Sequence, residues 1–164
     1  MDIVFKKATL NNLVDIQRLN AKLFQNQYEY DKDLVLDWPL SNEGQKYFKN
    51  LIENEIVYIA YDNDIIVGYI AGSYDKGIPY LTRKVAEVDN MYVNDEYRGQ
   101  NIGSKLVNIF KDECNKKDIF SYDVSVYWEN EKGIKFYERN GFERKLDLSL
   151  SCDDVQRRNN DESN

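Results

Sequence analysis

The stretch Arg98-Gly99-Gln100-Asn101-Ile102-Gly103-Ser104 has the composition of an anion-binding turn. It follows residues 85–93, which are typical of a strand, and it opens an amphipathic helix expected over 102–117. Glycines at a helix start let the backbone approach a ligand, and the unpaired N–H groups and the helix dipole attract phosphate there. The stretch is neither a P-loop nor a GxGxxG dinucleotide motif. Such a turn is often only a turn, so both interpretations stay open at this point.

The chain of 164 residues contains no histidine and only two cysteines, Cys114 and Cys152. Catalysis by Ser-His-Asp or Cys-His is therefore excluded, and so are zinc sites that need imidazole or several thiolates. We expect no metal, and any proton transfer must use carboxylate, tyrosine, lysine, cysteine or water. Glu87 and Asp89 stand two residues apart on the predicted strand, so their side chains share one face unless a bulge intervenes. Two carboxylates on an exposed strand face are the plain alternative.

The elements that must position these residues alternate along the chain. Strands are expected at 2–8, 56–61, 65–71, 85–93, 119–127 and 142–148, and helices after Thr9, from Ser41 or Asn42, over 102–117 and over 130–140. The order β-α-α-β-β-β-α-β-α-β predicts an α/β (α+β) fold. We expect a mixed, mostly antiparallel central sheet of six to seven strands with helices on both faces. Residues 1–148 are predicted to form one domain, and the polar residues 149–164 a disordered tail.

The turn 98–104 resembles the pyrophosphate loop of the GNAT superfamily of acyl-CoA-dependent N-acetyltransferases, which reads Gln/Arg-x-x-Gly-x-Gly/Ala. Asn101 stands where the first glycine is usual, and asparagine tolerates left-handed backbone angles better than other non-glycine residues. The segment Glu87-Val88-Asp89-Asn90-Met91-Tyr92-Val93 resembles the fourth strand of that family. Lys135-Phe136-Tyr137 and Asn140-Gly141-Phe142 resemble its strand-helix-strand ending. The resemblance covers roughly residues 56–146.

The resemblance implies a site for acetyl-CoA as the acyl donor. Residues 98–104 would bind its diphosphate, and Met91, Tyr92 and Val93 on the fourth strand would pair with the pantetheine arm. One backbone amide of that strand would steady the thioester oxygen, as in an oxyanion hole. Asn130 is a good N-cap for the helix 130–140. The matching asparagine of the family also contacts the cofactor arm, although capping alone would explain its presence.

The resemblance also implies catalytic roles. Tyr137 aligns with the tyrosine that protonates the departing thiolate, although a core aromatic at helical spacing from Ile134 is the alternative. The amine must lose a proton before it attacks. Glu87 occupies the position of the base in some family members, and Asp89 or a chain of water molecules could serve instead. Because no activated nucleophile is evident, we expect direct attack in a ternary complex without a covalent intermediate.

The sequence thus predicts an N-acetyltransferase that acts on a small-molecule or peptidic primary amine. A non-catalytic acyl-CoA-binding sensor or scaffold on the same fold is the alternative, and an unrelated interaction domain is a third reading. The identity of the amine is open. Aromatic and acidic residues of the loops near 25–42 and 74–84 could form a pocket for a cationic amine, or they could be ordinary surface residues.

The overall charge and the absence of long apolar stretches bound the remaining partners. A net charge of −7 without a basic block argues against nucleic-acid binding, which depends on Lys and Arg contacts to phosphate. No stretch is apolar enough to cross a membrane, and the first residues do not resemble a signal peptide, so we expect a cytoplasmic location. Pairing through the last strands is common in similar proteins, which is compatible with a homodimer.

Overall fold

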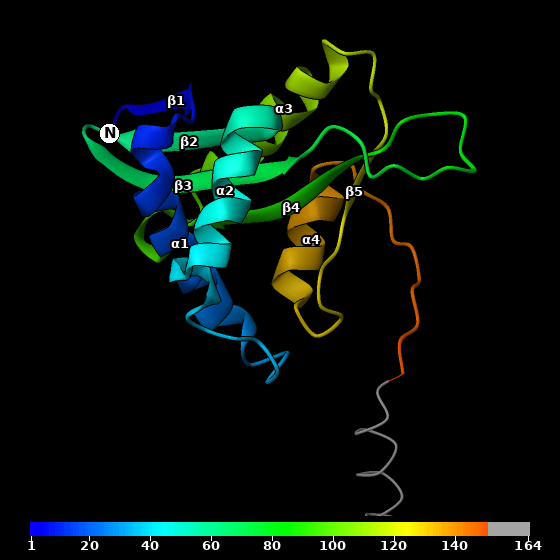
Figure 1. The fold of residues 1–164 in the computed structure, drawn as a ribbon, viewed down its shortest axis with the longest axis horizontal. Helices are drawn as coiled ribbons and strands as arrows, with labels where there is room; N and C mark the ends of the chain where they lie inside the picture. The colour runs from blue at the N-terminus through cyan, green and yellow to red at the C-terminus, as the bar shows by residue number, and fades with distance from the viewer. Residues whose placement is uncertain (151–164) are drawn as a thin grey trace, which may run out of the picture.

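A five-stranded sheet forms the centre of the computed structural model, which describes residues 1–150 (Figure 1). Its strands lie in sequence order and are β1 (Ile3–Lys7), β2 (Ile56–Asp62), β3 (Ile65–Ser73), β4 (Ala86–Val93) and β5 (Tyr122–Val124). The first four pair antiparallel, and β5 runs parallel to β4. The predicted mixed, mostly antiparallel sheet is therefore confirmed.

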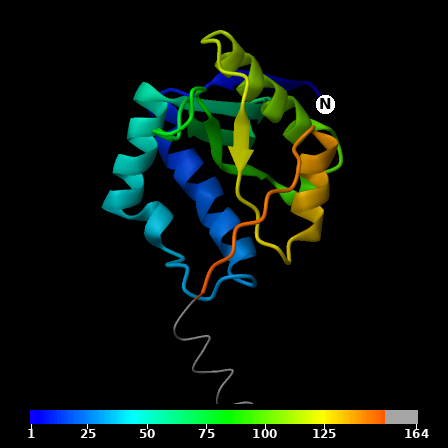
Figure 2. The same cartoon turned by 90° about the vertical axis from the view of Figure 1, so that its right-hand side faces the viewer.

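Two helices cover each face of the sheet (Figure 2). One face carries α1 (Leu13–Gln27) and α2 (Asn42–Asn54), and the other carries α3 (Ile102–Asn115) and α4 (Glu131–Arg139). Short 3-10 turns at Leu10–Asn12, Trp38–Leu40 and Asp95–Tyr97 join these elements. The prediction of helices on both faces is confirmed. No helix in residues 1–150 has both the length and the apolar character needed to cross a membrane.

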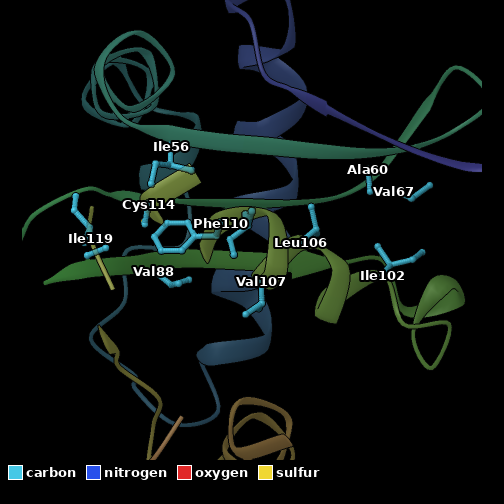
Figure 3. Packing of buried hydrophobic residues seen from close by; sticks show 12 residues of the cluster. Ile56, Ala60, Val67, Val88, Ile102, Leu106, Val107, Phe110, Cys114 and Ile119 are labelled. Carbon is cyan, nitrogen blue, oxygen red and sulfur yellow. The ribbon is translucent and has the colours of Figure 1, made fainter. Parts of the chain in front are cut away.

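The core beneath α3 fixes the start of that helix against the sheet (Figure 3). Apolar residues recur every four positions along α3, which places them in one stripe: Ile102, Leu106, Phe110 and Cys114. All four side chains are buried against strand residues such as Ile56 and Val88. Each large apolar side chain buried in this way contributes roughly 1.5–3 kcal/mol. The turn that precedes α3 is therefore held on a rigid support.

A second core holds α1 and α2 on the opposite face. Ile16 of α1 and Phe48 of α2 are fully buried, and both belong to the cluster that includes Tyr69 of β3. The Ser41 hydroxyl caps α2 by accepting a 3.1 Å hydrogen bond from the Gly44 amide. The two helices thus form a fixed wall above β4.

The last strand predicted from the sequence does not form. Residues 142–148 are described and belong to no strand, and β5 is confined to Tyr122–Val124 instead of 119–127. The sheet therefore has five strands, not six to seven, and within residues 1–150 the element order ends at α4. Leu146 and Leu148 alternate as in a strand, but they are 75% and 87% exposed. Alternation alone does not make a strand, because its N–H and C=O groups need a neighbouring chain. Of the predicted tail, 151–164 lie outside the described residues.

Candidate active site

Strands β4 and β5, the last two of the sheet, pair over only three residues each. Their pairing extends only from Ala86, opposite Tyr122, to Val88, opposite Val124. Beyond Val88, β4 continues to pair with β3 on its other side. The predicted cofactor residues Met91, Tyr92 and Val93 therefore lie on a part of β4 whose second edge pairs with no described strand. An extended ligand can use such an edge for backbone hydrogen bonds.

The turn between β4 and α3 has the predicted left-handed backbone. Asn101 has φ 65° and ψ 12°, and Gly99 has φ 76°. Among the described residues, none accepts a hydrogen bond from the first three N–H groups of α3, which belong to Ile102, Gly103 and Ser104. Unpaired N–H groups at a helix start favour an anion. Asparagine therefore supports here the conformation for which glycine is usual.

The two polar side chains that precede Asn101 fold back onto their own segment. The Arg98 Nε donates to the Val93 carbonyl at 3.0 Å, and its guanidinium lies 2.8 Å from the Asp95 carboxylate. The Gln100 amide donates to the Glu96 carbonyl at 3.3 Å. Contacts of Arg98 and Gln100 with a cofactor therefore stay predictions, and contacts through their side chains would require these to exchange partners.

A β-bulge in β4 makes Asp89 an extra residue of the strand. Asn90 pairs with Ala71 and Val88 pairs with Gly72, so Asp89 is an extra residue without a partner on β3. A bulge turns the side chains on either side of it, and both Asp89 and Asn90 reach the Tyr47 hydroxyl of α2. The strand is thus locally irregular at the point where it leaves β5.

The two candidate bases have different surroundings. The Glu87 carboxylate is ion-paired with the Lys76 ammonium at 2.8 Å. The Asp89 carboxylate accepts a 3.1 Å hydrogen bond from Tyr47. Asp89 is exposed as a whole residue, but its carboxyl is partly buried, and this burial raises the pKa of Asp89 from 3.8 to about 6. The hydrogen bond from Tyr47 lowers this pKa, and the charge of Glu87 raises it further. A carboxylate with this pKa is ionised at neutral pH and is a stronger base than an ordinary aspartate.

Tyr137 lies on α4 and is half-buried between two aromatic rings. Its ring centroid is 5.0 Å from that of Phe136 and 5.4 Å from that of Phe142. Burial raises the pKa of Tyr137 well above its usual value, so the phenol stays protonated at neutral pH. Its hydroxyl makes no hydrogen bond with any residue in 1–150. Tyr137 therefore packs as a core aromatic does and still has a hydroxyl that is free to donate a proton.

Asn130 caps α4, as its position predicts. Its Oδ1 accepts a 3.0 Å hydrogen bond from the Gly133 amide. The N-cap assignment is confirmed, and a contact of Asn130 with the cofactor stays a prediction.

A cavity of about 290 Å³ lies between α1, α2 and β4. Its lining residues are Asn20, Leu23, Phe24, Gln27, Trp38, Tyr47, Asp89 and Asn90. Sequence reasoning identified Asp89 as a candidate base and Trp38 as one of the aromatic residues of the 25–42 loop, but it missed the roles of Asn20 and Tyr47. The available signal was Asn20 itself, a polar residue within the apolar stripe of Ile16 and Phe24.

Other members of the proposed aromatic and acidic loop pocket lie elsewhere. Tyr30 stacks on Tyr127 at 5.7 Å, and the Tyr127 hydroxyl donates to Asp31. Tyr74 packs against the core beneath α3, and Tyr80 is 85% exposed. The cavity thus draws its aromatic wall from α1, Trp38 and α2, and its carboxylate comes from β4.

Residues 53–144 match the family model described as Acetyltransferase (GNAT) domain. The match spans more than half of the chain, so this protein belongs to the GNAT acetyltransferase family. The predicted family and its α/β fold are therefore confirmed.

Among sequence relatives, an uncharacterized N-acetyltransferase of Methanocaldococcus jannaschii is 28% identical over 144 residues, which cover 85% of this chain and 60% of that protein. The chain thus spans less than two thirds of that relative. The spermidine N(1)-acetyltransferase of Thermoplasma acidophilum is 27% identical over 149 residues, or 87% of this chain and 89% of that protein.

Solved structures show the same fold at low sequence identity. The PaiA N-acetyltransferase of Thermoplasma acidophilum in complex with coenzyme A has a TM-score of 0.76 at 20% identity, covering 91% of this chain and 94% of that one. An aminoglycoside acetyltransferase from an uncultured soil metagenomic sample, in complex with sisomicin, has a TM-score of 0.68 at 18% identity, covering 91% and 95%.

Proposed function

We propose that this protein transfers the acetyl group of acetyl-CoA to a primary amine by direct attack in a ternary complex. Membership of the GNAT family supports acyl transfer, and the coenzyme A complex of the Thermoplasma acidophilum neighbour supports the choice of donor. The observation that carries the proposal is the position of Asp89. Asp89 is the first residue of β4 beyond the part that pairs with β5, so its carboxylate lies where β4 and β5 separate.

The residues present fit acetyl-CoA. The amides of Ile102, Gly103 and Ser104 make no intramolecular hydrogen bond and would bind the diphosphate. The open edge of β4 around Met91 would pair with the extended pantetheine arm. Gly103 lies against Phe136, whose ring would be 3.1 Å from a Cβ at this position, so α3 and α4 meet closely beside the loop. When bound, the thioester supplies an electrophilic acyl carbon.

We propose Asp89 as the general base, with Glu87 or a water chain as the alternatives. The nitrogen of the acceptor forms a bond to the acyl carbon while the carbon–sulfur bond breaks, and the proton released from nitrogen passes to the Asp89 carboxylate. Asp89 is preferred because its carboxyl has a raised pKa and faces the cavity, whereas Glu87 is already ion-paired with Lys76. General bases of this kind contribute about 10²–10⁴ to the rate.

We propose Tyr137 as the general acid that protonates the departing thiolate. Its raised pKa makes it a weaker acid than a phenol in water. The same desolvation raises the proton affinity of a thiolate formed beside it, so the two pKa values stay matched. The rings of Phe136 and Phe142 each make a T-shaped contact with the Tyr137 ring, and these contacts do not use its hydroxyl.

The test compares Tyr137→Phe with the wild-type protein in two measurements. Calorimetric titration reports coenzyme A affinity, which we expect to be nearly unchanged, and steady-state kinetics reports kcat, which we expect to fall by about tenfold to a hundredfold or more. Tyr74→Phe, which also alters a half-buried tyrosine on the α3 face, is the matched control. An unchanged kcat would remove the acid assignment. Binding of coenzyme A without turnover of any amine would favour the sensor or scaffold alternative.

A further inference from the structure

The cavity between α1, α2 and β4 contains two buried amide oxygens that accept no hydrogen bond from the described part of the chain. Resting on the proposed function, we propose that it binds one primary ammonium group carried on an apolar body. Asn20 Oδ1, Asn90 Oδ1 and the Asp89 carboxylate would accept the three N–H bonds of that ammonium. All three residues line the cavity, and both amide oxygens are buried without a hydrogen-bond partner in the described residues.

The side chain of Asn20 is anchored through its amide nitrogen. The residue is 1% exposed, and its Nδ2 donates a 2.8 Å hydrogen bond to the hydroxyl of Tyr69, which is fully buried beneath α1 and α2. Because the nitrogen is engaged, the oxygen is left as an acceptor that has lost its water. A buried acceptor in this state is unfavourable until a donor reaches it. Asn20 therefore provides a fixed site for a donor.

The orientation of Asn90 follows from the charge of Asp89. The single proton of the Tyr47 hydroxyl is donated to the Asp89 carboxylate at 3.1 Å. The same hydroxyl oxygen must then accept from its other neighbour, the Asn90 Nδ2 at 3.1 Å. This turns Asn90 Oδ1 away from Tyr47 and leaves it unpaired. An ionised Asp89 thus prepares the second amide oxygen as an acceptor.

An ammonium group matches this set of acceptors. It carries three donors and no acceptor, so it can satisfy two amide oxygens and a carboxylate at once. Aromatic rings adjoin the acceptors: Trp38 stacks on Phe24 at 5.9 Å and lies 5.5 Å from Tyr47. Faces of such rings attract cations and pack well against apolar groups.

The rest of the lining limits the charge of the acceptor. Asp89 is the only ionisable carboxylate among the lining residues, and Leu23, Phe24 and Trp38 present apolar surface. A second ammonium would meet this apolar surface with no second carboxylate among the lining residues to pair with it, which is unfavourable. The cavity therefore fits a monoamine whose amine-bearing carbon joins an aliphatic or aromatic group. Polyamines and aminoglycosides, with several ammonium groups, fit it poorly.

Binding is tested by calorimetric titration of 2-phenylethylamine into the protein saturated with coenzyme A, which cannot react. We expect Asn20→Leu and Asn90→Leu each to weaken binding by about tenfold to a hundredfold, as for loss of a hydrogen bond to a charged group. Gln25→Leu, on the exposed side of α1, is the matched control and should bind as the wild type does. 2-Phenylethanol, which lacks the ammonium, should not bind. Unaltered coenzyme A affinity shows that a variant is folded. If Asn20→Leu fails to fold, the Asn90→Leu variant alone decides the test.

Specificity is tested by kcat/KM for three acceptors. We expect kcat/KM for 2-phenylethylamine, or for a short peptide amide beginning with leucine, to exceed kcat/KM for spermidine by at least about tenfold. The ratio of the first two values shows whether a free amine or a peptide N-terminus is preferred. Preferred acetylation of spermidine, or undiminished 2-phenylethylamine binding in both asparagine variants, would overturn this inference while leaving the proposed function intact. Ammonium binding that depends on the two asparagines, with no amine acetylated, would overturn the proposed function instead and leave this inference standing.

Discussion

Replacing Asp89 with asparagine keeps an acceptor for the Tyr47 hydroxyl but removes a partly buried negative charge. The pKa of this carboxyl is raised from 3.8 to about 6, mainly by burial. A rise of roughly two units corresponds to about 3 kcal/mol for a fully shielded group. Because the residue is also exposed to solvent, screening reduces this, and we expect about 1–1.5 kcal/mol.

The sign of this effect depends on pH. The folded-state pKa lies above the unfolded-state value, so the folded protein binds more protons between about pH 4 and 6 and loses stability as pH rises through that window. At pH 8 the penalty is fully present, and Asp89→Asn should therefore stabilise the protein. For a chain of this length, 1–1.5 kcal/mol corresponds to a Tm higher by about 3–5 °C. At pH 4 the two proteins should unfold at nearly the same temperature.

The assay is thermal unfolding followed by circular dichroism at pH 4 and pH 8, together with steady-state kinetics at pH 8. Asp64→Asn, at an exposed position in the turn between β2 and β3, is the control for loss of a surface carboxylate and should change Tm at pH 8 only slightly. If Asp89 is the base, kcat of Asp89→Asn falls by about 10²–10³. A lower Tm for Asp89→Asn at pH 8 would refute the reasoning from burial, and an unchanged kcat would refute the role as base.

Three further predictions concern the same region. The value of kcat/KM should rise to half its maximum near pH 6 and level off above, because Asp89 of the free enzyme is active in its ionised form, whereas a rise that continues toward pH 10 would contradict this. Asn101→Val should cost about 1–2 kcal/mol in unfolding free energy relative to Asn101→Gly, because a branched residue opposes φ 65°, and calorimetry should show weaker coenzyme A binding for the valine variant alone. Gly72→Ala should destabilise the fold by about 3 kcal/mol in chemical denaturation, since its Cβ would lie 2.1 Å from the Glu87 carbonyl and 2.7 Å from the Phe110 ring; a wild-type midpoint would refute this.

Features set by neighbouring residues were predictable from the sequence. The turn before α3 depends on backbone angles that glycine and asparagine adopt, and Asn101 does adopt them. The hairpin turn at 62–64 is another case, because Asn63 has φ 52° between β2 and β3. Asn130 forms its cap with the residue three positions later. In each case the decisive contacts lie within a few residues of chain.

The cavity beside Asp89 was not predictable because its residues come from four separate elements, α1, the 3-10 turn at Trp38, α2 and β4. Asn20 is fixed by Tyr69, which is 49 residues away in the sequence, and Tyr47 meets Asp89 across 42. No local pattern encodes these pairs. The strand predicted at 142–148 fails for a related reason, since alternation fixes which side chains share a face but does not supply a partner strand.

The bulge in β4 separates Asp89 from the residues of this strand that pack in the core. Ala86 and Val88 pack on the α3 side before it, and Met91 and Val93 pack on that same side after it. Deleting Asp89 from the sequence would leave an unbroken inward–outward alternation, so neither hydrophobic layer needs this residue to be placed. The side chain at the inserted position can therefore be exchanged while the residues that hold the sheet together keep their neighbours.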